Sequence, residues 1–309
     1  MTFADPLDRP PSKRNSAVNA WLRLVRLPNL LTVPGDAVAG YVLSIGASAE
    51  FSAPVLWAAA AGLIFYVAGL ILNDLADVDE DRRNRPDRPI AAGLISTRAA
   101  WRAALAALGL GLVFCSASGW RCLAAGCALA VAVAAYNFLP RSGILPIILL
   151  GACRALNVGL GIASAGAGNA AAWIGAGMVG LYVAALSLPA RGELSGERPG
   201  FSAWLPMAAL LTGGAALVLA GDVSESAAAR AAVPFLVAVG LSGAAARQLC
   251  RGPRSAAPAA VGSLIGALMP LQSALILASG GHGFAVAAAI AVMLAWPANR
   301  LLARAFAPS

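Results

Sequence analysis

The chain has 309 residues, of which 60% are hydrophobic and only 12% are charged, and its formal net charge is +8. Many apolar runs of about 20 residues exclude a soluble globular domain and predict an all-α, polytopic membrane protein. The positive charge does not indicate nucleic acid as a partner, because the basic residues are spread over short loops between apolar segments.

Residues 1–19 are polar and rich in Pro and Arg. They lack the basic-then-apolar order of a cleaved signal peptide, so we expect a short disordered cytoplasmic tail. Because SGGHG is all that separates the last two apolar segments, the sequence predicts nine or ten transmembrane helices. The ten segments of spanning length are 29–47, 54–72, 98–116, 120–138, 144–166, 171–189, 203–220, 230–249, 258–279 and 283–302.

The distribution of Lys and Arg predicts the orientation. With a cytoplasmic N-terminus and ten spans, 19 of the 22 basic residues lie on the cytoplasmic side, Arg121 and Arg230 lie outside, and Arg154 lies within the fifth segment. This asymmetry predicts a multi-pass protein of the cell (inner) membrane whose longest polar loops are cytoplasmic. Gly and Ala recur at close spacing in the spans, which predicts close packing of the helices.

The most polar stretch, residues 73–97, lies between the second and third spans. It holds six of the fourteen acidic residues, and Asp74, Asp77 and Asp81 would share one helical face within an arc of about 60°. Such a face needs cations, and Mg2+ commonly joins carboxylates to phosphates. Guanidinium groups, which suit phosphate oxygens, follow at once in Arg82, Arg83, Arg85 and Arg88. The stretch therefore indicates a diphosphate site, with a solvated connecting loop as the alternative.

A second polar stretch, residues 190–200, follows the sixth span. Glu193 and Glu197 are four residues apart and are flanked by Arg191 and Arg198. Two acidic faces on one membrane surface could close around a diphosphate from both sides, although this spacing is also typical of solvated loops.

Two polar groups inside the spans are candidates for the wall of a cavity. A charge within a membrane helix is costly and usually faces a polar cavity or a partner, which makes Arg154 and Asn157 candidate substrate-binding residues. Asp36 could be the counter-ion of Arg154 or could line the mouth of the cavity. Tyr136 and Arg141 end the fourth span, where the tyrosine could be catalytic or an interfacial anchor.

These motifs resemble those of the UbiA superfamily of intramembrane prenyltransferases. The family's NDxxDxxxD motif is matched by Asn73, Asp74, Asp77 and Asp81, and RPIAAGLIS resembles the continuation of that motif, with Arg88 in place. The resemblance covers residues 20–305, which we expect to form one transmembrane prenyltransferase domain. The second motif departs from the family, because GELSGERPG carries glutamates where aspartates are usual. Together with CRALNVGLG, this motif most resembles the UbiA-like branch called EboC.

The resemblance implies a helix bundle around a central, lipid-facing cavity and a Mg2+-dependent transfer of a prenyl group from a polyprenyl diphosphate to a small, electron-rich acceptor, with an aromatic acceptor favoured. It assigns metal binding to Asp74, Asp77, Asp81, Glu193 and Glu197. Catalytic roles fall on the same three aspartates and on Tyr136 and Arg141. Substrate binding falls on Asn73, Arg88, Arg154, Asn157, Arg191 and Arg198.

Two alternatives stay open. A UbiA-like protein could bind or transport a prenylated lipid without catalysis, since glutamates place their carboxylates differently from aspartates and Mg2+ tolerates poor geometry badly. A transporter with Arg154 at a midplane site is the other alternative. The sequence carries no signal for the length of the prenyl chain, the identity of the acceptor or the oligomeric state.

Overall fold

The computed structural model describes the backbone of residues 13–140, 142–195 and 199–305. Within these ranges the chain is helical, with three short 3₁₀ turns and no strand. The α-helices are α1 (Lys13–Leu24), α2 (Leu27–Leu30), α3 (Pro34–Ile45), α4 (Ala53–Ala76), α5 (Val78–Asn84), α6 (Thr97–Ser118), α7 (Trp120–Phe138), α8 (Leu145–Ser164), α9 (Ala170–Ser195), α10 (Leu205–Leu219), α11 (Glu225–Arg251), α12 (Ala257–Gly266), α13 (Leu268–Ala278) and α14 (Phe284–Ala305).

Ten segments of the described chain are long and apolar enough to cross a membrane. Their bounds agree with the predicted spans to within a few residues, and the count of ten is confirmed over nine. Two of these segments are interrupted. The first, Leu27–Ser48, consists of α2 and α3 with a short 3₁₀ turn, and the ninth, Ala257–Ala278, consists of α12 and α13.

The chain is already helical before the end of the expected tail. Helix α1 begins at Lys13, whereas the sequence predicted a disordered segment through residue 19. Ala20 and Leu24 are each 1% exposed and belong to the same apolar cluster as the helices α4 and α6, so packing of this side of α1 outweighs its polar composition. Residues 1–12 lie outside the described part of the chain.

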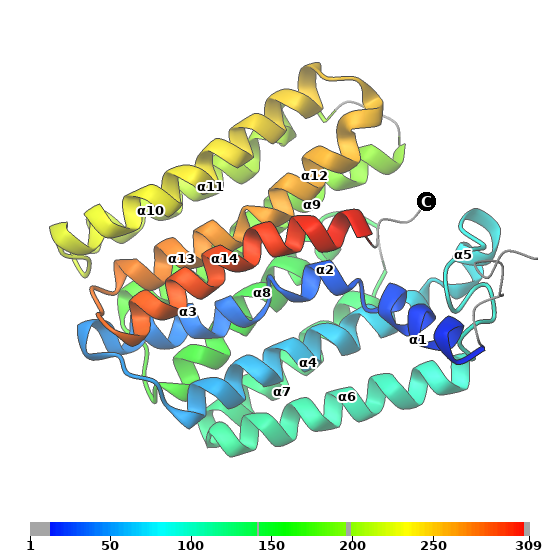
Figure 1. Cartoon of the computed structure of the whole chain (residues 1–309), viewed down its shortest axis with the longest axis horizontal. Coiled ribbons are helices and arrows are strands. Elements are labelled where there is room, and N and C mark those ends of the chain that lie inside the picture. The colour runs from blue at the N-terminus through cyan, green and yellow to red at the C-terminus, as the bar shows by residue number, and fades with distance from the viewer. Residues whose placement is uncertain (1–12, 141, 196–198, 306–309) are drawn as a thin grey trace, which may run out of the picture.

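The helices run roughly along one axis (Figure 1), with α13 among the most enclosed. Ten of its eleven residues are buried, as expected for an apolar helix surrounded by others. By contrast, only 17% of the positions in the α14 span are buried, which suits a helix that faces lipid.

Small residues bring α3 and α8 into direct backbone contact. A Cβ atom at Gly40 would collide with the backbone of Val158, and one at Gly161 would collide with that of Ala37. The predicted role of small residues in close helix packing is confirmed at this crossing.

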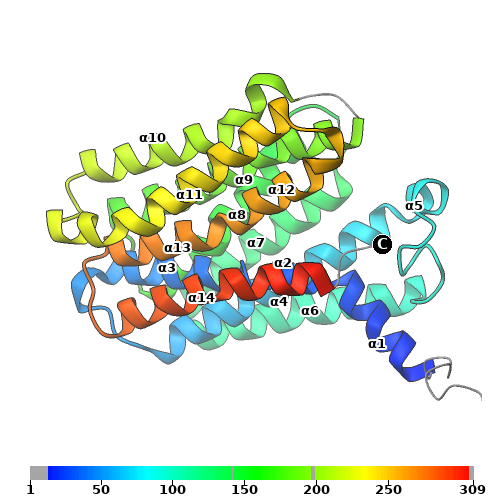
Figure 2. The ribbon, with the colours of Figure 1, turned by 45° about the horizontal axis from the view of Figure 1, so that its top comes forward.

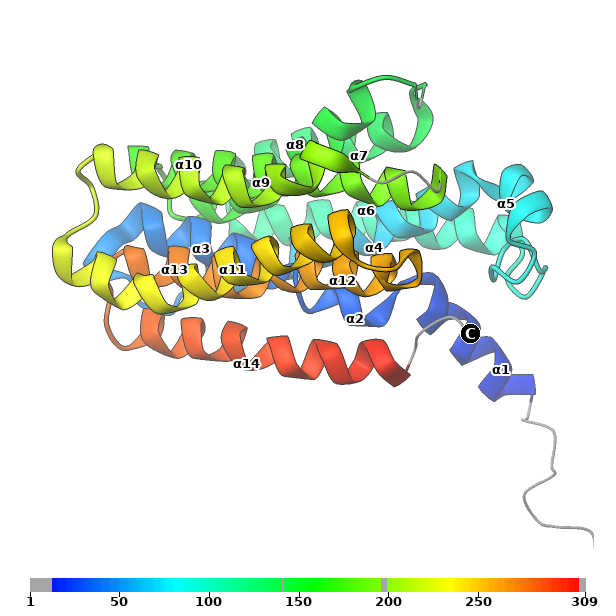
Figure 3. The same ribbon diagram turned by 90° about the horizontal axis from the view of Figure 1, so that it is seen from above.

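The polar segments gather at one end of the bundle. Helices α1 and α5 project there (Figures 1 and 2), and the C-terminal end of α9 lies at the same end (Figure 3). The first polar stretch and the described beginning of the second therefore lie at the same end of the bundle, as the distribution of Lys and Arg predicted.

Candidate active site

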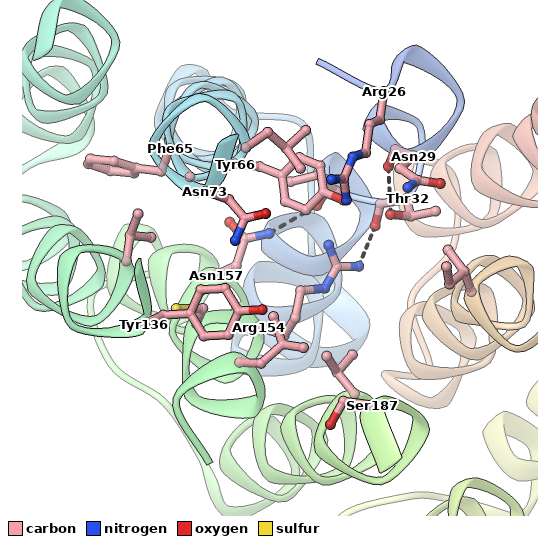
Figure 4. Close-up of a pocket in the computed structure, with 18 of the residues that line it drawn as sticks. Arg26, Asn29, Thr32, Phe65, Tyr66, Asn73, Tyr136, Arg154, Asn157 and Ser187 are labelled. Carbon is pink, nitrogen blue, oxygen red and sulfur yellow. Dashed lines mark hydrogen bonds between the residues drawn. The ribbon is translucent and has the colours of Figure 1, made fainter. Parts of the chain in front are cut away.

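A cavity of about 450 Å³ lies inside the bundle, beneath this polar end. Residues of α4, α7, α8, α9, α12 and the start of α13 line it, together with the segment from Arg26 to Val33 (Figure 4). On α4 the lining runs from Asn73 to Gly62, which corresponds to a depth of roughly 16 Å at the helical rise. Most of the wall is apolar. Its polar members are Arg26, Asn29, Thr32, Tyr66, Asn73, Tyr136, Asn137, Arg154, Asn157 and Ser187.

Two buried carboxylates and one guanidinium form a cluster beside the mouth of the cavity. Arg88 Nη1 donates to Asp81 Oδ2 at 2.8 Å and lies 3.4 Å from Asp74 Oδ1. Asp74 Oδ1 also lies 3.5 Å from Nη2 of Arg26, which lines the cavity. The cluster thus connects the acidic stretch to the cavity through Arg26.

The three aspartates follow one nearly continuous helical course. Helix α4 ends at Ala76, but the hydrogen bonds from Asp77 N to Asn73 O (3.0 Å) and from Asp81 N to Asp77 O (2.8 Å) continue its pattern into α5. Asp74 and Asp81 reach the same nitrogen, so they share a face as the spacing predicted. Asp77 lies between them in the chain and is half-buried.

The carboxylates are arranged around Arg88 rather than gathered into a three-acid cluster. Among the described residues, no group of three or more His, Cys, Asp or Glu side chains is placed to hold a metal ion. Yet Asp74 and Asp81 converge on one cationic nitrogen, so the donor set suits a cation at this point.

Arg26 reaches the cavity through an unusual backbone conformation. Its φ of 47° and ψ of 58° make it the one non-glycine residue in the described chain with positive φ. This left-handed conformation costs about 1 kcal/mol or more for a residue with a Cβ atom, and such costs tend to occur at functional sites. The conformation joins α1 to α2 and turns the chain where the guanidinium meets Asp74.

A second polar cluster lies deeper in the membrane part, where Arg154 and Asp36 form a buried ion pair. Arg154 Nε lies 3.1 Å from Asp36 Oδ2, and Asn157 Nδ2 donates to the same oxygen at 2.9 Å. Gln272 Nε2 donates to Asp36 Oδ1 at 2.6 Å. Asp36 is therefore the counter-ion of Arg154, one of the two roles that the sequence left open.

This cluster forms because the first span is broken between α2 and α3. Pro34 begins α3, and Asp36 N bonds to Val33 O instead of Thr32 O, so the Thr32 carbonyl lacks a helical partner. Arg154 Nη2 and Gln272 Nε2 each donate to Thr32 O at 2.7 Å, and Asn157 Nδ2 donates to Val33 O at 3.1 Å. Irregular backbone within a membrane persists only where other groups satisfy it, as these do.

Asn73, Tyr136, Arg154 and Asn157, predicted as site residues, all line the cavity. Asp74, Asp81 and Arg88 meet beside its mouth. Asp77, half-buried, lies between Asp74 and Asp81 in the chain. The other five predicted residues fall, wholly or by their side chains, outside the described part of the chain. These are Arg141, Glu197 and Arg198 entirely and the side chains of Arg191 and Glu193.

The sequence interpretation missed several polar groups of the site, among them Gln272, Tyr66 and Arg26. Gln272 is fully buried in an apolar span, and a lone Gln in such a span was a readable signal. Tyr66 and Arg26 line the cavity, but nothing in their local sequence distinguishes them from interfacial residues.

The fold and the site define a multi-pass membrane protein with an internal cavity under a cluster of acids and arginines. The model of the UbiA prenyltransferase family matches residues 37–306, and the chain belongs to this family. The match confirms the resemblance seen in the sequence at the level of the family, and the likeness to the EboC branch stays a prediction.

Among curated proteins, the chain is similar to enzymes named digeranylgeranylglyceryl phosphate synthase. It is 30% identical to that of Metallosphaera sedula over 142 residues, which are 46% of this chain and 50% of the relative. It is 39% identical to that of Methanoculleus marisnigri over 95 residues, which are 31% of this chain and 33% of the relative. The matches therefore span half or less of these relatives.

Solved structures share the fold. The apo structure of a UbiA homolog from Aeropyrum pernix K1 has a TM-score of 0.63 at 19% identity and covers 80% of this chain and 96% of its own. A UbiA homolog from Archaeoglobus fulgidus bound to DMAPP and Mg2+ has a TM-score of 0.58 at 16% identity, covering 82% of this chain and 99% of its own.

Proposed function

We propose that this protein transfers a prenyl group from a prenyl diphosphate to an acceptor within the membrane. One observation carries the proposal: in a member of the UbiA prenyltransferase family, an apolar cavity of about 450 Å³ ends beside Arg26 and the Asp74–Arg88–Asp81 cluster. A donor with an apolar tail and an anionic head has this same division of polarity. The tail fits the apolar wall, and the diphosphate fits the arginines.

Mg2+ completes the proposed donor site. The Archaeoglobus fulgidus homolog is bound to Mg2+ together with DMAPP, and in this chain Asp74 and Asp81 already converge on a cationic nitrogen. We assign Mg2+ binding to Asp74, Asp77 and Asp81 and, from the second motif, to Glu193 and Glu197. When bound, the ion neutralises negative charge on the diphosphate.

The residues of the chain then favour ionisation of the donor. As the allylic C–O bond breaks, its electron pair leaves with the diphosphate, and hydrogen bonds from Arg26 and Arg88 strengthen as that charge grows. The ring of Tyr136 lies in the cavity wall, where its face can stabilise the allylic cation. The apolar wall keeps water away from the cation until the acceptor attacks it and loses a proton.

The names of the relatives point to a different class of acceptor from the one that the sequence favoured. The sequence favoured an aromatic acceptor, whereas the curated relatives are named for a product in which glyceryl phosphate carries the prenyl groups. We therefore extend the acceptor class to polar-headed lipids of the glyceryl type.

We also propose that the polar end of the bundle faces the cytoplasm. With that orientation 19 of the 22 Lys and Arg residues lie on the cytoplasmic side of the cell membrane. The donor would then enter from the cytoplasmic leaflet, at the end where α5 projects (Figure 1).

Diphosphate release tests this proposal. The detergent-purified protein is given dimethylallyl, geranyl and geranylgeranyl diphosphate with and without Mg2+, each with a glyceryl phosphate or an aromatic acid acceptor. We expect Mg2+-dependent release that Asp77→Asn abolishes without unfolding, because this substitution removes a carboxylate and little packing. The matched control is Asp79→Asn, since the Asp79 side chain is 83% exposed and pairs with Arg82. Full activity of Asp77→Asn would refute the assignment of Mg2+ to this face.

A second candidate is a protein that binds or moves a prenylated lipid without transfer. Arg88 already neutralises Asp74 and Asp81, which favours a site that works without a metal. Donor binding distinguishes the two functions. If Mg2+ alters neither the affinity for geranyl diphosphate nor its cleavage, the lipid carrier replaces the enzyme.

A further inference from the structure

The deep polar cluster leaves part of one guanidinium available to a ligand. Nη2 of Arg154 donates to the Thr32 carbonyl and Nε faces Asp36, while Nη1 makes no hydrogen bond to a described residue. Arg154 is 6% exposed and lines the cavity, and Figure 4 shows its guanidinium there beside Thr32. A guanidinium carries five N–H donors, so this edge can still bind an oxygen.

Asp36 removes the net charge of this site. Its carboxylate is fully buried and is held on both oxygens, by Gln272 on Oδ1 and by Asn157 and Arg154 on Oδ2. A second anion at Arg154 would meet the attraction of the guanidinium and, a few ångströms further, the repulsion of Asp36. In a weakly screening interior the two largely cancel, and the anion still loses its hydration.

The mouth of the cavity differs from the deep wall in its exposure to water. The side chain of Arg26 is 41% exposed there, so an anion bound beside it keeps contact with water. The two ends of the cavity thus select different groups: an anion at Arg26 and Arg88, and an uncharged oxygen at Arg154.

We propose that Arg154, held by Asp36 and Gln272, is a binding site for an uncharged hydroxyl or carbonyl oxygen of the acceptor. That this oxygen belongs to the acceptor rests on the function proposed above. The preference for an uncharged oxygen rests only on the cluster of Arg154, Asp36 and Gln272. Asp36 and Gln272 are positioning residues, since they act through the guanidinium. Asn157 contributes by fixing Asp36 and the Val33 carbonyl.

Cys153 offers a native reporter for this site. It lines the cavity next to Arg154 in the chain, whereas Cys115 and Cys122 are fully buried. In a Cys127→Ser, Cys250→Ser background, alkylation of Cys153 by N-ethylmaleimide is followed by intact mass. The probes are hexanamide and hexanoate, which have the same number of heavy atoms and nearly the same shape but differ in charge.

We expect hexanamide to slow the alkylation of Cys153 at a concentration at least tenfold lower than hexanoate. In the double variant Asp36→Asn, Arg154→Met this advantage should fall to threefold or less. Asp222→Asn is the matched control, because Asp222 accepts a hydrogen bond from Ala171 N and neither residue lines the cavity. This variant should leave the advantage unchanged.

Equal or stronger protection by hexanoate in the wild type would overturn the proposal, as would an advantage of hexanamide that survives the double variant. Absence of protection by hexanamide up to its solubility limit would overturn it too. Equal or stronger protection by hexanoate in the wild type overturns the proposal even if the double variant fails to fold. Diphosphate release is measured separately, so a protein that prefers the amide but releases no diphosphate would lose the proposed function and keep this site.

Discussion

Removing the negative charge of Asp36 should destabilise the protein far more than removing the whole ion pair. Asp36 is fully buried and accepts from Gln272 at 2.6 Å and from Asn157 at 2.9 Å, with Arg154 Nε at 3.1 Å. Asp36→Asn leaves the Arg154 charge without a counter-ion, and breaking a buried pair in this way costs roughly 3–5 kcal/mol. In Asp36→Asn, Arg154→Met no charge remains, and Gln272 still donates to the Thr32 carbonyl. We expect that double variant to lie within about 1–2 kcal/mol of the wild type.

Thermal unfolding of the purified protein in one detergent measures both variants and Arg154→Met alone. The single Asp36 variant should lower the apparent Tm by something on the order of 10 °C, and the second substitution should restore most of that loss. Because Arg154→Met alone also leaves a buried charge unpaired, the double-mutant cycle should give a coupling energy of at least about 2 kcal/mol. A cycle with additive effects would refute the reasoning, because it would mean that Asp36 and Arg154 do not depend on each other's charge.

Two further predictions concern the mouth and the wall of the cavity. Arg88→Gln should reduce diphosphate release at least tenfold, since it removes the donor shared by Asp74 and Asp81, while Arg82→Gln, on the exposed Arg82–Asp79 pair, should leave release unchanged. Gly62→Ala should cost about 1–3 kcal/mol of unfolding free energy, because a Cβ atom there meets the Asn157 amide. Gly177→Ala, in a helix with open space around the new methyl group, should be neutral or stabilising by up to about 1 kcal/mol in the same unfolding assay.

The helices could be predicted from the sequence because spanning length and composition determine them. The segment 120–138 was placed to the residue, and the others differ by only a few positions. The interruptions were not predicted. Pro34 alone does not reveal that α2 and α3 are separate, since proline is also common in the first turn of a continuous helix. That break became visible only through the partners of the Thr32 carbonyl.

The acidic face of the site was predictable, but its pairing was not. Helical spacing places Asp74 and Asp81 on one face, and Arg88 reaches both. No spacing rule says which of the four arginines between residues 82 and 88 folds back, because the turn after α5 decides it. Gln272 shows the same limit, since its partner Asp36 lies 236 residues away in the chain.

The deep cluster follows from the broken first span by a series of physical requirements. A carbonyl without a helical partner inside the membrane needs donors, and Arg154 and Gln272 supply them to Thr32. A guanidinium at that depth needs a counter-charge, which Asp36 supplies from the first turn of the adjoining helix. The amides that fix Asp36 need space beside the backbone, and Gly35 and Gly62 leave that space to Gln272 and Asn157. Because each group is held by the fold itself, the wall around Arg154 is in place before any ligand arrives, which is the condition for a cavity that selects its ligand by charge.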